Sequence, residues 1–505
     1  MRPQLWKPVS YLEWNASRRG GSGAIWDATG EITFDQLLAH VRRFERLLAA
    51  RGVRAGDVIA VQLPNIWQYV ALELAIPDLG AVIMPVPTSL GEHEIGWVLA
   101  RTRPPLVVAG AAAIAGKLAG DAACDVEELT SASAHGLPAP TGADPDPSRV
   151  VEVALTSGTT GMPKLASLSA GLKQVTFESF TARLQITDAD RVLPMTALTQ
   201  GIGGMCLYCS RLGAALIMLG EPHWTPEHCL ATAAGARATV MVGVPTNVIR
   251  MLSCPRLDAA SLAAVRAVAV AGAPMPPEVA ERWELSTRIP VCSFYGSMDA
   301  GQLAVASPSD PQAARWTSVG RPHDRAEWAI LDAGGEPVEP GGTGEICMRG
   351  DLVQQGYWGE ETGPYSSDGW AHMGDLGFVD GAGYLHVSGR LKDIIIRGGT
   401  NINPYELESV LLSHPDVIDA CVVGRPDGEL GEVPVAFVVT RPGFEPGRQE
   451  LDRFLKGRGL ARYKWPEMVS RLDELPLTGP GKVNRRSLRE LAASMQVGGD
   501  DADVV

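Results

Sequence analysis

Apolar positions along the chain follow two patterns, helical spacing and short continuous runs, which alternate repeatedly. Residues 31–50 (EITFDQLLAHVRRFERLLAA) have apolar side chains at helical spacing after Thr33, which predicts a helix that starts there. The next segments predict a strand, a helix ending at Gly80 and a second strand, over residues 57–63, 67–80 and 81–87. Further apolar runs predict strands at 191–195, 213–219, 238–245 and 265–274. Because strands alternate with helices, we expect an α/β fold built from layered, largely parallel sheets.

The pattern changes twice toward the C-terminus. Residues 326–350 are punctuated by glycines, which indicates an antiparallel or β-barrel-like subdomain. Beyond residue 390, strands and helices form an α+β unit of roughly one hundred residues, a normal size for a separate domain. Its strands are expected at 394–399, 417–426 and 433–440, and its helices at 404–415, from Gln449 and after Asn484. We therefore predict a large N-terminal domain over 1–390, a small C-terminal domain over 391–492 and a disordered acidic tail over 493–505.

Composition narrows the classes of partner. The net charge of −14 argues against a nucleic-acid or acidic-membrane partner, and no apolar stretch reaches the length of a membrane span. The first residues, MRPQLWKPVS, lack the apolar core of a signal peptide, so we expect a cytoplasmic protein. We also expect either a monomer or a homodimer. Cys206 and Cys209 form one C-x-x-C pair without a second pair, which does not indicate a zinc site.

The segment 155–164, LTSGTTGMPK, follows an apolar strand and combines glycines, hydroxyl side chains and a lysine. Gly158 and Gly161 permit backbone conformations closed to other residues, and the exposed N–H groups of such a turn can hold an anion. Lys164 adds a compact positive charge. The segment does not match the Walker A pattern, because Pro163 precedes the lysine and Leu165 replaces the magnesium-binding hydroxyl. It predicts a loop that wraps a polyphosphate.

This loop resembles the phosphate loop of the adenylate-forming superfamily, which includes acyl- and aryl-CoA synthetases. Further segments resemble the superfamily in the same order along essentially the whole chain: VAVAGAPMPPEV (268–279), SFYGSMDAG (293–301), SVGRP (318–322), GEICMRGDLVQQGYW (344–358), the long segment 369–408 and LPLTGPGKVNRRSL (475–488). The resemblance implies that a carboxylic acid attacks the α-phosphate of ATP to give an acyl adenylate, which then passes to a thiol. It also implies a mobile C-terminal domain.

The resemblance implies roles for individual residues. Lys482 matches the lysine that reaches between the acid and the α-phosphate, and Lys164 matches the lysine on the triphosphate. Tyr295 matches the aromatic residue stacked on adenine, Asp375 the carboxylate on the ribose, and Arg390 a second ribose contact. The full set implied for ATP or AMP is Thr156, Ser157, Gly158, Thr159, Thr160, Gly161, Gly272, Ala273, Pro274, Tyr295, Gly296, Ser297, Met298, Asp375 and Arg390. Asp299 matches a Mg²⁺ ligand, Lys392 the hinge between domains, and Gly398 with Gly399 the lining of a thiol tunnel.

The sequence departs from the superfamily at two places. The usual Thr-Glu pair is Met298-Asp299 here, which removes one hydroxyl donor and shortens one carboxylate. The stretch after Pro194 lacks both the His of many acid ligases and the Asp that pairs with an amino-acid substrate. We therefore expect a neutral pocket for an aromatic or alicyclic acid, with a medium-length fatty acid as the nearest rival. Its expected wall is Ala197, Leu198, Thr199, Gly203, Val244, Pro245, Gly272, Ala273, Gly296, Ser297 and Met298.

The acceptor thiol is expected to belong to CoA or to the phosphopantetheine of a separate carrier protein. The segment RGGTNINPYELE favours CoA, and Arg397, Arg425, Arg462 and Lys464 are candidates for its 3′-phosphate. The leading hypothesis is an ATP-dependent acid–CoA ligase. The alternatives are an acid–carrier-protein ligase and a non-catalytic member that only binds acyl or nucleotide ligands.

Overall fold

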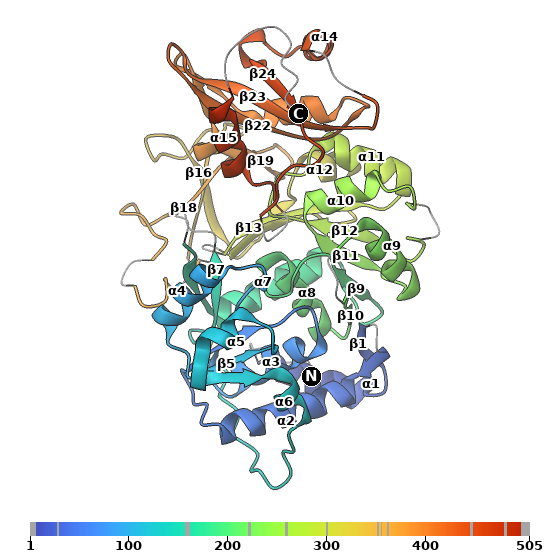
Figure 1. Ribbon diagram of the computed structural model, residues 1–505, viewed down its shortest axis with the longest axis vertical. Helices are drawn as coiled ribbons and strands as arrows, with labels where there is room; N and C mark the ends of the chain where they lie inside the picture. The colour runs from blue at the N-terminus through green and yellow to red at the C-terminus, as the bar shows by residue number, and fades with distance from the viewer. Residues whose placement is uncertain are drawn as a thin grey trace.

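The computed structural model describes residues 7–27, 30–156, 162–220, 224–257, 261–298, 301–350, 353–354, 356–360, 363–444, 448–478 and 482–495. The chain forms a large N-terminal domain of stacked α/β sheets, and the small C-terminal domain lies across one end of it (Figure 1). The expected α/β class is confirmed. The boundary after residue 390 stays a prediction.

The first sheet has the order β6-β5-β3-β4-β7-β8 and is parallel except for the β7–β8 pair. Its strands are β3 (Val58–Gln62), β4 (Val82–Pro85), β5 (Leu106–Ala109), β6 (Ala123–Asp125), β7 (Val150–Thr156) and β8 (Lys164–Ser169). Strands β3, β4 and β5 are buried along their whole length, as expected where helices cover both faces of a parallel sheet.

The second sheet has the order β15-β14-β13-β12-β11-β9-β10-β1-β2 within the described residues. Its strands are β1 (Gly23–Asp27), β2 (Gly30–Thr33), β9 (Arg191–Pro194), β10 (Ala215–Ile217), β11 (Val240–Gly243), β12 (Ala267–Val270), β13 (Val291–Ser297), β14 (Gly301–Val305) and β15 (Arg321–Pro322). The central strands are parallel, which confirms the four expected strands between residues 191 and 274. The N-terminal hairpin β1–β2 joins this sheet through β10, which lies almost two hundred residues later.

Helices pack between and around these sheets. They are α1 (Pro8–Arg19), α2 (Phe34–Ala50), α3 (Trp67–Asp78), α4 (Glu92–Thr102), α5 (Ile114–Ala119), α6 (Val126–Ser131), α7 (Ala170–Arg183), α8 (Gly201–Arg211), α9 (Pro226–Gly235), α10 (Pro245–Leu252), α11 (Pro277–Thr287) and α12 (Gln312–Thr317). Thr33 caps α2 in a reciprocal capping box with Gln36, which explains where this helix begins. Helix α3 is buried from Gln68 to Asp78 and shares a core with strands of both sheets.

A four-stranded antiparallel sheet follows, with the order β16-β17-β18-β19. Its strands are β16 (Glu327–Leu331), β17 (Gly344–Arg349), β18 (Ala371–Val379) and β19 (Leu385–Arg390). Ile346, Met348 and Leu385 pack in one cluster with Tyr295 and Leu303, so this sheet is fixed to the β13–β14 hairpin. The antiparallel insertion expected from the glycine pattern is confirmed.

The C-terminal domain is a five-stranded sheet with helices. Its elements are β20 (Ile395–Arg397), β21 (Thr400–Ile402), α13 (Pro404–Leu412), β22 (Val417–Asp427), β23 (Gly431–Thr440), α14 (Arg448–Gly457), β24 (Met468–Arg471) and α15 (Arg485–Ser494). It contacts the N-terminal domain through α11 and α13, where the Ser409 hydroxyl donates to Glu278 Oε2 at 2.7 Å. Within the described residues, no helix is both long enough and apolar enough to span a bilayer.

Candidate active site

Tyr295, Asp375 and Arg390 meet where three strands converge. The Tyr295 hydroxyl donates to Asp375 Oδ2 at 2.8 Å, and Arg390 Nε donates to Oδ1 of the same carboxylate at 2.7 Å. Asp375 and Arg390 are direct partners in the antiparallel β18–β19 ladder, while Tyr295 comes from β13. Asp375 is 5 % exposed, so these two donors replace hydrogen bonds to water that its oxygens lose on burial. Burial and the nearby Asp375 charge raise the pKa of Tyr295, which keeps its hydroxyl a donor.

Lys482 enters the same site from the C-terminal domain. A Cβ placed on Gly272 would lie 2.6 Å from Lys482 Cε and 3.3 Å from its Nζ. Burial lowers the pKa of Lys482, the Arg390 charge lowers it further, and the Asp375 charge opposes both. Thr478 N donates to Lys482 O at 2.7 Å and Asn484 N to Pro476 O at 2.7 Å, so the backbone at 482–484 is paired with that at 476–478. The structure thus brings together the predicted residues Lys482, Gly272, Asp375, Arg390 and Tyr295.

The start of α8 forms the next wall of the site. A Cβ on Gly201 would lie 2.7 Å from Met298 Sδ, and one on Gly203 would lie 2.1 Å from the Ala197 carbonyl oxygen. A Cβ on Gly272 would also lie 2.7 Å from Ile202 Cδ1. The predicted pocket residues Ala197, Gly203, Gly272 and Met298 therefore surround the first turn of α8, with Ile202 as a neighbour that sequence reasoning missed.

The loop before α8 is held by hydrogen bonds to a residue that is distant in the sequence. Asn65 accepts from Leu198 N at 2.7 Å and donates to the Thr196 carbonyl at 3.0 Å. The hydroxyls of Thr196 and Thr199 are buried and have no hydrogen-bond partner among the described residues. No sequence signal indicated Asn65, since it lies more than 130 residues from the loop that it holds.

Other predicted pocket and nucleotide residues lie at the ends of the central strands. Val244 and Pro245 begin α10 directly after β11, while Ala273 and Pro274 follow Gly272 after β12. Gly296 and Ser297 end β13, and a Cβ on Gly296 would lie 2.4 Å from the Gly301 carbonyl oxygen, so only glycine fits there. The carboxyl ends of parallel strands are where open α/β sheets bind ligands.

The predicted phosphate loop connects β7 with β8. Thr156 and Lys164 are direct partners at the end of this hairpin, and the buried Thr156 hydroxyl has no hydrogen-bond partner among the described residues. Lys164 Nζ donates to the Tyr357 hydroxyl at 3.3 Å and lies 4.7 Å from the centre of that ring. Tyr357 was missed as a partner, although it lies in the quoted segment 344–358. Ser157, Gly158, Thr159, Thr160, Gly161 and Asp299 lie outside the described residues.

The predicted hinge and thiol-tunnel residues lie at the start of the C-terminal domain. Lys392 is exposed, while the next residue, Asp393, is buried and accepts from Arg489 Nη2 at 2.5 Å. Gly398 and Gly399 have φ of +54° and +80° and form the two-residue turn between β20 and β21. A Cβ on Gly398 would meet Leu430 Cδ2 at 3.5 Å and one on Gly399 would meet no heavy atom of the described residues within 4 Å, so neither glycine lies against the Asp375 site.

Two further features lie apart from this site. Cys206 and Cys209 are buried in α8, where burial raises the pKa of both thiols.

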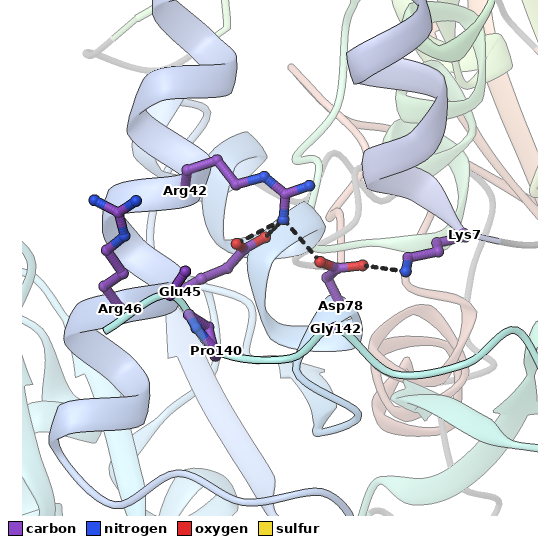
Figure 2. A pocket seen from close by; sticks show the side chains of 8 residues that line it. Lys7, Arg42, Glu45, Arg46, Asp78, Pro140 and Gly142 are labelled. Atoms are coloured by element: carbon purple, nitrogen blue, oxygen red, sulfur yellow. Dashed lines mark hydrogen bonds and ion pairs between the residues drawn. The ribbon is translucent and has the colours of Figure 1, made fainter. Parts of the chain in front are cut away.

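A cavity of about 420 Å³ lies beside α1 and α2, at the opposite end of the molecule from the C-terminal domain (Figures 1 and 2). Figure 2 shows Arg42 between Glu45 and Asp78, at 2.7 and 3.0 Å, with Lys7 on the far side of Asp78 at 3.6 Å. Because none of the residues that line this cavity belongs to the predicted site, the cavity is not the site that the motifs predict.

Comparisons with known proteins agree with this geometry. Residues 12–358 match the AMP-binding enzyme family, and residues 406–482 match the AMP-binding enzyme C-terminal domain. The chain is 33% identical to a feruloyl-CoA synthase from Amycolatopsis over 485 residues, covering 94% of this chain and 95% of that relative. It is 32% identical to an indoleacetate–CoA ligase from Aromatoleum aromaticum, covering 96% and 98% of the two chains. The solved o-succinylbenzoate CoA synthetase from Bacillus subtilis, in complex with its acyl-adenylate intermediate, superposes with a TM-score of 0.81 at 29% identity, covering 95% and 97%.

Proposed function

Because the chain belongs to the AMP-binding enzyme family, we propose that it is an AMP-forming ligase that joins a carboxylic acid to CoA. In the first half-reaction a carboxylate oxygen attacks the α-phosphorus of ATP, and pyrophosphate leaves as the bridging bond breaks. In the second, the CoA sulfur attacks the acyl carbon, its proton is released, and AMP leaves. The approach of Lys482 to Gly272, beside the Asp375–Arg390 pair, is the observation that carries this proposal.

The first half-reaction must bring two anions into contact, so it needs fixed positive charge and oriented donors. Lys482 supplies a cation from the other domain, and its amine lies close enough to Arg390 and Asp375 to be influenced by both. Asp375 accepts from the ribose hydroxyls while Tyr295 and Arg390 hold its carboxylate in place. Lys164 and the loop after Thr156 hold the β- and γ-phosphates.

Asp299 would hold the Mg²⁺ that accompanies ATP. Oxygen donors suit this cation, and the hydroxyl of Thr156, which has no hydrogen-bond partner among the described residues, offers a further neutral oxygen at the start of the loop. The bound ion would reduce the negative charge that the acid must approach.

The acid is aromatic or alicyclic and carries no second charge. The predicted pocket wall consists of small or apolar residues and threonine, with no charged side chain among Ala197, Leu198, Thr199, Gly203, Val244, Pro245, Gly272, Gly296 and Met298. An ammonium group or a second carboxylate would therefore lose its hydration without gaining a partner. The named relatives that act on ferulate and indoleacetate support an aromatic acid.

The second half-reaction uses rotation of the C-terminal domain about Lys392, which brings the Gly398–Gly399 turn to the site. Glycines at this turn leave room for the pantetheine arm beside the backbone. Arg425 is a poor candidate for the CoA 3′-phosphate, because it is 5 % exposed and its Nη1 contacts Met468 Sδ. Lys464 is partly buried in the same domain and already pairs with Glu406 at 2.7 Å.

Pyrophosphate exchange across a panel of acids, including ferulate, indoleacetate, benzoate and octanoate, tests the proposal. Exchange with an aromatic acid, followed by formation of its thioester with CoA, supports it. Thioester formation only with a phosphopantetheinyl carrier protein would favour the carrier-protein ligase. If no acid supports pyrophosphate exchange, although calorimetry shows that the protein binds ATP, a non-catalytic binding protein would be favoured.

A further inference from the structure

His372 lies between two carboxylates, three residues before Asp375. Its Nδ1 is 2.7 Å from Glu345 Oε2, and its Nε2 is 2.9 Å from Asp368 Oδ2. The second oxygen of Glu345 accepts from Gly374 N at 3.0 Å. A continuous chain of hydrogen bonds therefore runs from Asp368 through His372 and Glu345 to the backbone N–H of Gly374, the residue before Asp375.

The short contacts indicate protons on both ring nitrogens. A carboxylate oxygen that faces each nitrogen at hydrogen-bond distance needs a donor on each, which makes the ring an imidazolium. The hydrogen bond to Glu345, followed by that to Asp368, raises the pKa of His372 against the opposing effect of burial. The ring is therefore charged over a wider pH range than an isolated histidine.

A metal ion would need a different spacing. Glu345 Oε2, Cys347 Sγ and His372 Nδ1 all lie within 4.8 Å of one another. Ligands of a tetrahedral zinc ion stand roughly 3.3 Å apart, which is wider than the 2.7 Å between the oxygen and the nitrogen here. Burial first, and then the Glu345 and Asp368 charges, raise the pKa of Cys347 to about 12, so this side chain is a neutral thiol.

Asp375 lies in an irregular part of its strand. Glu345 pairs with Leu376 in the β17–β18 ladder, whereas Cys347 pairs with His372, so β18 has two more residues than β17 between these pairs. Gly374, with φ of +68°, turns the backbone inside this bulge. Its N–H donates to Glu345 instead of to a strand partner. The Glu345 carboxylate thus stabilises the bulge that directs Asp375 toward Tyr295 and Arg390.

We propose that His372 is a positioning residue for nucleotide binding: by holding Glu345 against Gly374, it fixes the bulge that aims Asp375 at the ribose hydroxyls. This rests on the proposed function, since it requires that Asp375 binds the nucleotide. His372 touches neither the acid nor the nucleotide, and its effect passes through Glu345.

A pH dependence follows from this arrangement. The titratable groups that face the ring are Glu345 and Cys347 on β17 and Asp368 in the preceding loop; further along β17, Arg349 pairs with Glu327 and covers Trp370. Because the folded pKa of His372 is raised, both of its donors are present below pH 6.5, and one of the two is lost as the pH rises through the folded value. Affinity for ATP should therefore fall at alkaline pH.

Titration calorimetry with ATP and Mg²⁺ from pH 6 to 9 tests the proposal on the full-length protein. His372→Ala should bind about five- to tenfold more weakly than wild type at pH 6.5, and the two should converge as the pH rises. His372→Arg keeps a permanent cation, so its affinity should stay near the wild-type low-pH value throughout. Glu345→Gln should move the wild-type fall in affinity to lower pH, because it removes the main cause of the raised pKa.

Carbon-13 NMR of histidine-labelled protein gives a readout that does not require nucleotide. The signal missing from His372→Arg belongs to His372 and should titrate above pH 6.5, and Glu345→Gln should lower that midpoint.

Asp375→Asn distinguishes failure of the positioning role of His372 from failure of the nucleotide role of Asp375. If it weakens ATP binding while His372→Ala does not at any pH, the positioning role is refuted and the proposed function stands. If Asp375→Asn binds ATP like wild type, the nucleotide role of Asp375 fails and this inference fails with it.

Discussion

Gly272 of the N-terminal domain lies against the side chain of Lys482 from the C-terminal domain. A methyl group added at Gly272 therefore tests the contact between these two residues directly. The φ of Gly272 is +87°, and a Cβ there would lie 2.6 Å from Lys482 Cε and 2.7 Å from Ile202 Cδ1. Ordinary carbon contacts begin at about 3.5 Å, so Gly272→Ala must displace the lysine side chain by roughly 1 Å. A shift of that size at a reacting centre costs on the order of 100-fold in rate.

The substitution also strains the backbone, which by itself costs about 1–3 kcal/mol of stability. Gly335 is a matched control, since its φ is +83° and a Cβ there would meet no heavy atom within 4 Å. Both substitutions should therefore lower the thermal midpoint, Gly272→Ala by more because its methyl group also meets Ile202, while only Gly272→Ala should slow acyl-adenylate formation. The assay is pyrophosphate exchange at saturating ATP and acid. Exchange by Gly272→Ala within threefold of Gly335→Ala would refute the close approach of Lys482.

Four further substitutions test other parts of the structure. Asp375→Asn should weaken ATP binding by about 2–3 kcal/mol, or roughly 30- to 150-fold, whereas Tyr295→Phe keeps the carboxylate and should cost under tenfold; equal losses would contradict the ribose role. Met298→Thr should raise the rate of pyrophosphate exchange several-fold by restoring a hydroxyl donor, and an unchanged rate would show that the donor is dispensable. Burial, opposed by Arg42, raises the pKa of Glu45 to about 7, so the stability it contributes is lost as the pH rises from about 4.5 through 7. Urea unfolding of Glu45→Gln should therefore show a gain over wild type that grows between pH 5 and 8, by at most about 1.4 kcal/mol per pH unit, and a constant difference would contradict that pKa.

Much of the fold could be predicted because its signals are local. Buried parallel strands such as β11 and β12 are continuous apolar runs, and α2 has both its periodicity and its Thr33 cap in the sequence. Helix α3 is buried on all sides and therefore lacks a polar face, but the length of its apolar segment and the glycine at position 80 still indicate a helix. The pairing of β1 with β10 has no local signal, because it joins segments almost two hundred residues apart.

The site divides in the same way. Motifs predicted Tyr295, Asp375, Arg390 and Lys482, and the structure brings them together. The groups that hold them were missed, because a supporting contact depends on three-dimensional neighbours. Asn65 bonds to the loop before α8, and Glu345 reaches Gly374 only because β18 contains a bulge. Neither contact leaves a repeated pattern in the sequence.

Separate measurement of the two half-reactions in Lys482→Ala tests the central claim most directly. The claim is that the C-terminal domain brings this cation to the acid and the α-phosphate for the first step alone. Pyrophosphate exchange should fall about 100- to 1,000-fold, as when one donor to a developing charge is removed. Thioester formation from supplied acyl adenylate and CoA should stay within a few-fold of wild type. Equal loss in both half-reactions, or no loss in the first, would contradict the account.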